Sequence, residues 1–128
     1  MKYGHTITTN KSIIQAKKVL QDELVKEGLG QLFEIPFSKK LNEKLNLSLD
    51  EYHILGVCHP PSAYRALAIE KQIGLFLPCT IIVYSEFGTT HVATMLPSKV
   101  MNIIDNPELD VIAKDVELKL IRVINRLV

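Results

Sequence analysis

The spacing of apolar and polar residues predicts alternating strands and helices along the chain. Residues 3–9 alternate and are rich in Thr and Ile, which predicts a strand. Residues 11–27 carry an apolar side chain at every third or fourth position, which predicts an amphipathic helix. We expect Asn10 to cap this helix and Gly28 to end it, because glycine adopts the left-handed conformation without penalty. The inner positions of the helix are Ile13, Ala16, Leu20 and Leu24.

The middle of the chain has shorter elements. Residues 31–37 are typical of a strand, and Pro36 places it at a sheet edge or ends it there, because proline donates no ladder hydrogen bond. Residues 38–47 are expected to form a short helix with Leu41 and Leu45 inward. The other expected elements are a strand at 51–58, a helix at 62–71 with Pro61 at its start, a strand at 75–84, a turn at 86–89 and an antiparallel strand at 90–96.

The C-terminal part is expected to be helical, with a short helix at 97–105 and a longer one that Asn106 caps and Pro107 begins. The inward stripe of the long helix is Leu109, Ile112, Ala113, Val116, Leu120, Val123 and Leu127. Further apolar residues lie off this stripe, namely Val111, Leu118, Ile121 and Ile124. Such a wide apolar surface favours a homodimer contact, although a domain that wraps the helix more fully would also explain it.

This order of elements predicts an α+β fold. We expect a two-layer sandwich of a mostly antiparallel sheet, with helices packed on one face and a long C-terminal helix. The strands are apolar enough that a partner could cover part of the second face. A chain of 128 residues without repeats or linkers suits a single domain, residues 1–128.

Composition excludes several classes of protein. The chain is 47% hydrophobic and 23% charged, as is usual for a soluble globular protein. Its net charge of +1 provides no strong field for nucleic acid or for an anionic membrane, so we expect neither partner. The N-terminus has no apolar signal region and no run suits a membrane span, which predicts a cytoplasmic protein. Two cysteines in such a protein are expected to be free thiols.

Both cysteines lie between residues 52 and 84, next to turns rich in proline and glycine. Cys58 ends a strand just before a helix, where amide dipoles would favour a thiolate and lower the thiol pKa. Cys79 begins the next strand, after Pro78. If the two strands are neighbours, the thiols could pair reversibly, bind a soft metal or hold a thiol-reactive ligand. Alternatively, both are small core residues.

Other residues near the thiols are weaker candidates. Cys58, Cys79 and His59 could form a three-ligand metal site, although no metal-helix spacing supports it and chance scatter of four histidines explains the same facts. Tyr64 and Arg65 could orient an anion near the start of their helix, or could be packing and surface residues. The sequence has no phosphate-binding loop, nucleophile elbow or paired-carboxylate motif, so nucleotide-dependent and common hydrolytic chemistry have no support.

Several segments together resemble a known family. They are Tyr3-Gly4-His5-Thr6-Ile7-Thr8-Thr9, Tyr52-His53-Ile54-Leu55-Gly56-Val57-Cys58-His59-Pro60, Ala63-Tyr64-Arg65-Ala66-Leu67, Ile73-Gly74-Leu75-Phe76-Leu77-Pro78-Cys79 and Asn106-Pro107-Glu108-Leu109. The chain is similar over essentially its whole length to the domain-of-unknown-function family three hundred and two. The resemblance implies a single domain with a fold like that of the TATA-binding protein, commonly dimeric and without an established activity. It implies no DNA binding, because fold does not determine function.

Two functional hypotheses follow. The preferred one is a dimeric module that binds a small ligand or a soft metal near Cys58 and Cys79, in a pocket lined by Tyr52, Leu77, Pro78 and the helix start at Pro61. The identity of any ligand or cofactor does not follow from the sequence.

The alternative is a thiol-dependent enzyme or redox protein with Cys58 as nucleophile. It requires an exposed thiol with a lowered pKa, and His53, His59, His91 or Cys79 within bonding reach. We prefer the binding module because the sequence places no general base convincingly beside either thiol.

Overall fold

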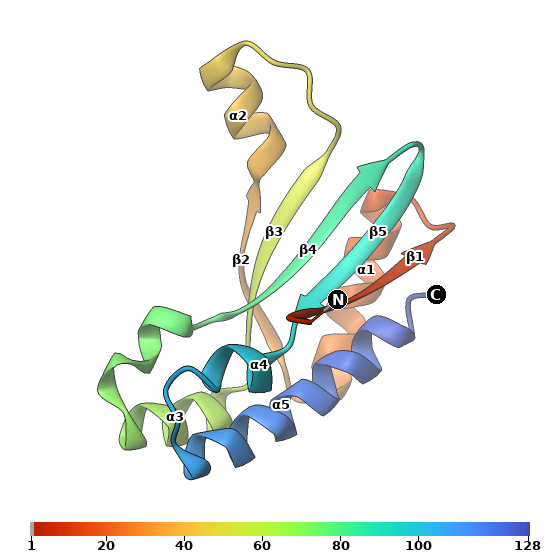
Figure 1. The fold of residues 1–128 in the computed structure, drawn as a ribbon. Helices are drawn as coiled ribbons and strands as arrows, with labels where there is room; N and C mark the ends of the chain where they lie inside the picture. Colours follow the sequence, from red (N-terminus) through yellow and green to blue (C-terminus); the bar gives the residue numbers. More distant parts are fainter. Residues whose placement is uncertain (1) are drawn as a thin grey trace.

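The computed structural model describes residues 2–128 and has two layers, a sheet and a set of helices (Figure 1). All strand pairs are antiparallel, in the order β1-β5-β4-β3-β2. The strands are β1 (Gly4–Thr9), β2 (Gly30–Pro36), β3 (Tyr52–Cys58), β4 (Cys79–Glu86) and β5 (Thr89–Met95). The helices are α1 (Ile13–Lys26), α2 (Phe37–Leu45), α3 (Pro60–Ile69), the short 3-10 helix η1 (Lys71–Phe76), α4 (Pro97–Met101) and α5 (Pro107–Asn125). The predicted α+β sandwich is confirmed. Within residues 2–128 no helix has both the length and the apolar character needed to cross a membrane.

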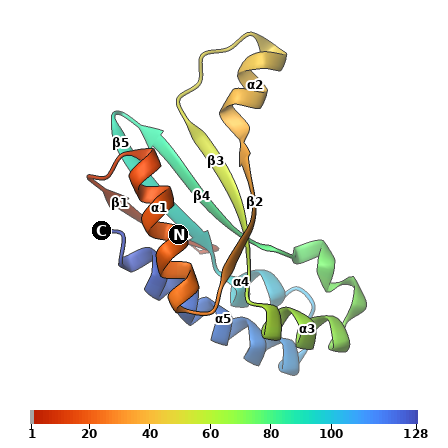
Figure 2. The same ribbon diagram turned by 180° about the vertical axis from the view of Figure 1, so that it is seen from behind.

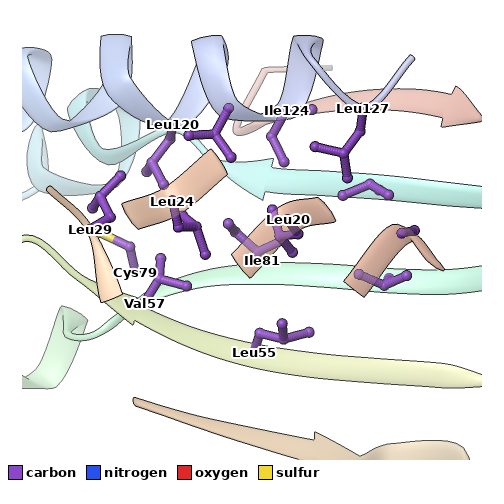
Figure 3. Packing of buried hydrophobic residues seen from close by; sticks show 14 of the residues in the cluster. Leu20, Leu24, Leu29, Leu55, Val57, Cys79, Ile81, Leu120, Ile124 and Leu127 are labelled. Carbon is purple, nitrogen blue, oxygen red and sulfur yellow. The ribbon is translucent and has the colours of Figure 1, made fainter. Parts of the chain in front are cut away.

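Helices α1 and α5 cover one face of the sheet, as the view from behind shows (Figure 2). Side chains of both helices point toward β3 and β4 and form the main core (Figure 3). Its fully buried members include Leu20, Leu24, Leu55, Val57, Ile81, Leu120, Ile124 and Leu127. Ile124, which lies off the predicted stripe, is therefore buried by its own chain, because α5 packs against α1 as well as against the sheet.

The starts of the two long helices differ in how well their caps were predicted. Asn106 caps α5 as expected, since its side chain accepts hydrogen bonds from two first-turn amides. Asn10 does not cap α1. Ser12 does so instead, because its hydroxyl accepts from the Gln15 amide at 3.2 Å while the Gln15 side chain accepts from the Ser12 amide at 3.0 Å. This reciprocal pair satisfies two free amides at once. Gly28, with φ of 77°, follows the end of α1 as expected.

The segment before β4 also differs from the prediction. Residues 75–78 were expected to be part of a strand, but η1 runs to Phe76 and β4 begins only at Cys79. Glu70 starts η1 by accepting a hydrogen bond from the Gln72 amide. The apolar run at 75–77 was ambiguous because periodicity alone does not separate a short buried strand from a helical turn.

Helix α2 and the loop after it form an arm, residues 37–51, that rises from one end of the sheet (Figure 1). The Ser38 hydroxyl accepts from the Tyr52 amide, and the Asn42 side chain accepts from the Leu49 amide. Leu45 was predicted to point inward, but it is 61% exposed. The prediction was wrong because the arm extends beyond the sheet and has no second layer of its own chain to pack against.

Charged side chains hold the end of α1 against α5. Glu27 contacts Arg122 at 2.9 Å and Arg126 at 3.0 Å, and Arg126 also reaches Glu23. The hydrogen bond from Arg122 is the main reason that the pKa of Glu27 falls to about 2. Ion pairs of this kind near the surface add modest stability, so the network chiefly orients the two helices.

A close contact at Gly56 provides a test of the packing on the face of the sheet that α1 and α5 do not cover. The Phe33 ring lies over Gly56, and a β-carbon there would overlap the ring and come within 2.8 Å of Pro78 Cγ. We expect Gly56→Ala to lower the free energy of unfolding by about 1–3 kcal/mol. Gly30→Ala is the matched control on the adjacent strand, because nothing lies within 4 Å of its added methyl group. Urea denaturation of both variants measures the difference, and equal stabilities would contradict the close packing.

Candidate functional site

A cavity of about 340 Å³ lies where β3 ends and β4 begins. Helices α3 and α4 and the first half of α5 surround it, and these helices gather at one end of the sheet in Figure 1. The cavity occupies the seam between two core clusters. Val57, Cys79 and Val116 belong to the main cluster under the sheet, whereas Met101 and Leu109 belong to the smaller cluster between α3, α4 and α5.

Small residues on facing helices leave this space open. Ala63 and Ala66 of α3 line it on one side, Ala113 of α5 lines it on another, and Gly74 of η1 contributes no side chain. Ala113 was expected only as a core residue of the long helix, and Met101 was not named from the sequence. The available signal was the recurrence of alanine on α3 and α5, the two helices that begin at prolines 60, 61 and 107.

Five of the residues that the sequence suggested line the cavity: Cys58, His59, Leu77, Pro78 and Cys79. Pro61, at the start of α3, is not part of the lining. The strand register explains why the thiols gather, because Val57 pairs with Cys79 and Cys58 is the next residue on β3. Both cysteines are free thiols, and Cys79 is only 7% exposed.

The thiols do not have the lowered pKa that was expected. Burial raises the pKa of Cys58. Burial, together with the nearby Cys58, raises the pKa of Cys79 to about 11. The expectation relied on amide dipoles at the start of α3, but α3 begins with Pro60 and Pro61. Proline has no N–H group, so the first turn offers few amide donors to stabilise a thiolate.

His59 is held by its neighbours on α3 rather than by a thiol. Its Nδ1 lies 2.6 Å from Ser62 Oγ, and Arg65 Nη2 donates to the same oxygen at 3.4 Å. Because Arg65 can only donate, the Ser62 hydroxyl is free to donate its proton to His59 Nδ1. Burial is the main cause of a lowered His59 pKa; Lys119 and Arg65 lower it further, and Asp115 opposes them. His59 is therefore neutral near pH 7.

The remaining candidates lie elsewhere. Tyr52 is at the far end of β3, roughly 20 Å along a seven-residue strand, where it stacks on Tyr84 with ring centroids 5.3 Å apart. It does not line the cavity that was expected to include it. Tyr64 is 75% exposed and also outside the lining. Arg65 reaches the site through Ser62, and Ser62 was not identified from the sequence.

The site does not bring together enough ligating side chains to hold a metal ion. Among residues 2–128 no group of three or more His, Cys, Asp and Glu side chains is placed to hold a metal ion. The three-ligand site of Cys58, Cys79 and His59 that was considered from the sequence is thus not formed. His53 is at the other end of β3, where its Nδ1 contacts Glu34 at 2.9 Å.

Comparison with known proteins agrees with this fold. The profile described as "Domain of unknown function DUF302" matches residues 5–127. The chain belongs to the DUF302 family. It is also similar to a solved structure titled "Crystal structure of uncharacterized conserved protein DUF302 from Bacillus stearothermophilus", with 31% identity, a TM-score of 0.94 and 100% of each chain covered. No curated protein matches the chain. Neither description states an activity, so the functional argument depends on the cavity itself.

Thiol reactivity tests the environment of this cavity. At pH 8 a raised pKa leaves little thiolate, and only the thiolate reacts with iodoacetamide. We expect both cysteines of the native DUF302 protein to react more slowly than a free thiol, with Cys79 slower than Cys58. A pKa of about 11 at Cys79, against about 8.5 for a free thiol, reduces its thiolate more than a hundredfold. Mass spectrometry after timed labelling measures both rates. If Cys58 reacts as fast as in the unfolded chain, its thiol is not the partly buried, neutral group described here.

Proposed function

We propose that this DUF302 protein is a small-ligand binding module that holds an apolar molecule in the cavity beside Cys58 and Cys79. The observation that carries the proposal is the lining, which is almost entirely aliphatic and contains only a few polar groups. Ligand sites typically have this composition and volumes of roughly 300–1,000 Å³. At about 340 Å³, the cavity would hold on the order of ten water-sized atoms, at about 30 Å³ each.

The chemistry of the thiols supports binding over covalent catalysis. A cysteine nucleophile needs a thiolate and a base within reach. Burial raises the pKa of both thiols, and the one histidine that lines the cavity uses its Nδ1 toward Ser62. Neutral, polarisable sulfur atoms suit contact with an apolar ligand. An organic ligand is also favoured over a soft metal, because only two thiols and a partly engaged imidazole gather here.

The size of the cavity bounds the affinity. A ligand that buries about eight methylene groups would gain roughly 6 kcal/mol, at about 0.8 kcal/mol for each group. Association costs reduce this gain. Apolar burial alone therefore gives a dissociation constant no tighter than roughly tens of micromolar, which suits a protein that exchanges its ligand.

We also propose that the protein is a homodimer, formed through the face of the sheet that the helices leave open. By register, Phe33, Ile35, Ile54 and Ile82 share this face, and Phe33 and Ile35 are 42% and 37% exposed. Most of this face is visible in Figure 1, where α4 passes in front of only the lower ends of β2 and β3. Five strands spaced about 4.8 Å apart and about 20 Å long provide roughly 500 Å².

The arm supports a second copy as the partner on this face. Its apolar residues Leu45, Leu47 and Leu49 are exposed and have no layer of their own chain to cover them. A standard interface buries about 800 Å² from each partner, which the sheet face and the arm can supply together but not separately. A two-fold axis would place each arm against the other copy. Of the α5 residues that suggested a contact there, Ile124 is already buried, whereas Val111 and Leu118 are exposed. We favour the sheet face because the exposed arm extends the apolar surface beside it.

Filling the cavity tests ligand binding. We expect Ala63→Leu to weaken binding of the uncharged fluorophore 1-aminonaphthalene at least tenfold. This molecule of about eleven non-hydrogen atoms matches the size of the cavity, and the added side chain would occupy the same space. Ala68→Leu is the matched control on the same helix, where the alanine is exposed and outside the lining. Fluorescence titration gives both affinities. The proposal fails if the native protein does not bind the fluorophore or if both variants bind it equally.

A charge on the open face tests the dimer. We expect the native protein to sediment at twice the 14.4 kDa mass of the chain, and Ile82→Lys to sediment as a monomer because a buried unpaired ammonium opposes association. Ile14→Lys, at an exposed position on α1, serves as the control and should remain dimeric. Sedimentation velocity at about 100 μM protein distinguishes the states. A monomeric native protein at that concentration would rule out the proposed contact.

A further inference from the structure

We propose that the ligand of this cavity is an unbranched aliphatic monocarboxylate of roughly eight carbons, with its carboxylate at the Arg65 side. This inference depends on the proposed binding function and specifies the chemical class of the ligand. It is supported by the polarity of the cavity, by the hydrogen bond from Arg65 to Ser62 and by the cavity volume.

Polar atoms able to bind a ligand head group occur at one side of the cavity. His59 and Ser62 lie three residues apart at the start of α3, and both line it. Apart from the two thiols, the other side chains of the lining are aliphatic, from Leu32 on β2 to Met101 on α4. A ligand that satisfies such a lining has one polar end and a continuous apolar remainder, because an unpaired polar group against the aliphatic wall would be unfavourable.

Arg65 supplies the charge that selects an anionic head group. Its Nη2 donates to Ser62 Oγ at 3.4 Å, and Ser62 is only 2% exposed. Arg65 is exposed and does not itself line the cavity, but its guanidinium reaches from the surface to a buried hydroxyl of the lining. Within residues 2–128 Arg65 forms no ion pair. A guanidinium has five donors arranged to bind a carboxylate with two parallel hydrogen bonds, and most of these donors remain available here.

The charges around His59 leave a net positive charge at this side of the cavity. Arg65 and Lys119 are both close enough to lower the pKa of His59, and Asp115 alone opposes them. Asp115 lies 3.6 Å from Lys119 and is compensated by it. The remaining charge at this side of the cavity is that of Arg65, which favours a ligand with a single negative charge.

The volume limits the length of the ligand. About ten non-hydrogen atoms would fit at roughly 30 Å³ each. Octanoate has a matching size, with its carboxylate oxygens at the polar side and its chain along Ala66 and Ala113. The uncharged molecule of the same length is 1-octanol, which would make the same apolar contacts without the ionic one.

Competition between these two molecules tests the proposal. Octanoate and 1-octanol are each titrated at pH 7.5 against native protein preloaded with 1-aminonaphthalene. We expect octanoate to bind at least tenfold more tightly than 1-octanol, as is typical for a hydrogen-bonded charge. Arg65→Gln should weaken octanoate about tenfold and leave 1-octanol within twofold of its native affinity. Lys18→Gln, which removes an equally exposed positive charge on α1, should change neither.

Each outcome has a distinct meaning. Arg65→Lys should recover part of the octanoate affinity, because it keeps the charge but loses the paired donors. Equal affinity of native protein for octanoate and 1-octanol, or an Arg65→Gln variant that binds octanoate normally, would overturn the carboxylate ligand while leaving the apolar binding site intact. If neither molecule nor the fluorophore binds the native protein, the proposed function itself fails. Because Arg65 is exposed, its variants are expected to fold, which circular dichroism checks.

Discussion

The burial of α5 is the constraint on which the rest of this structure depends. The second half of the helix, with Leu120 and Leu127, packs on α1 and the sheet and completes the main core. The first half, with Leu109 and Ala113, lies against α3 and α4 instead. One helix therefore belongs to two clusters that no strand connects. The cavity lies at the seam between them, where alanine on two facing helices leaves space that larger side chains would fill.

The same local sequence determines both the position of the thiols and their lack of reactivity. Cys58 and Cys79 are brought together by the pairing of β3 with β4. Two prolines directly after His59 begin α3 but remove the amide donors that would have stabilised a thiolate. Desolvation then dominates, and both thiols remain neutral. The polar chemistry of the site consequently belongs to His59, Ser62 and Arg65 rather than to sulfur.

Much of the fold follows from local patterns in the sequence, whereas the shape of the site does not. The stripe on α5 and the Asn106 cap depend on spacing within one helix, and spacing is visible in a sequence. Asn10 and Ser12 are both good capping residues, and the reciprocal bond with Gln15 decides between them. Tyr52 was expected to line the same pocket as Cys58, but the two residues lie at opposite ends of β3. The position of a cavity is harder still to predict from sequence, because it depends on which helices pack together across the fold.

The cavity and the open sheet face are connected through β2 and β3. The register of β2 shifts between Gln31 and Phe33, so that it passes an extra residue, Leu32, along its partner strand. Leu32 lines the cavity, and Phe33 lies over Gly56 on the open face, next to the position of Pro78. Pro78 is itself part of the cavity wall. A second copy that packs on Phe33 would thus fix the ring that lies beside this wall. Since a close-packed interior transmits small displacements, the proposed dimer contact and the proposed ligand site would both depend on the bulge of β2, although they lie on different surfaces.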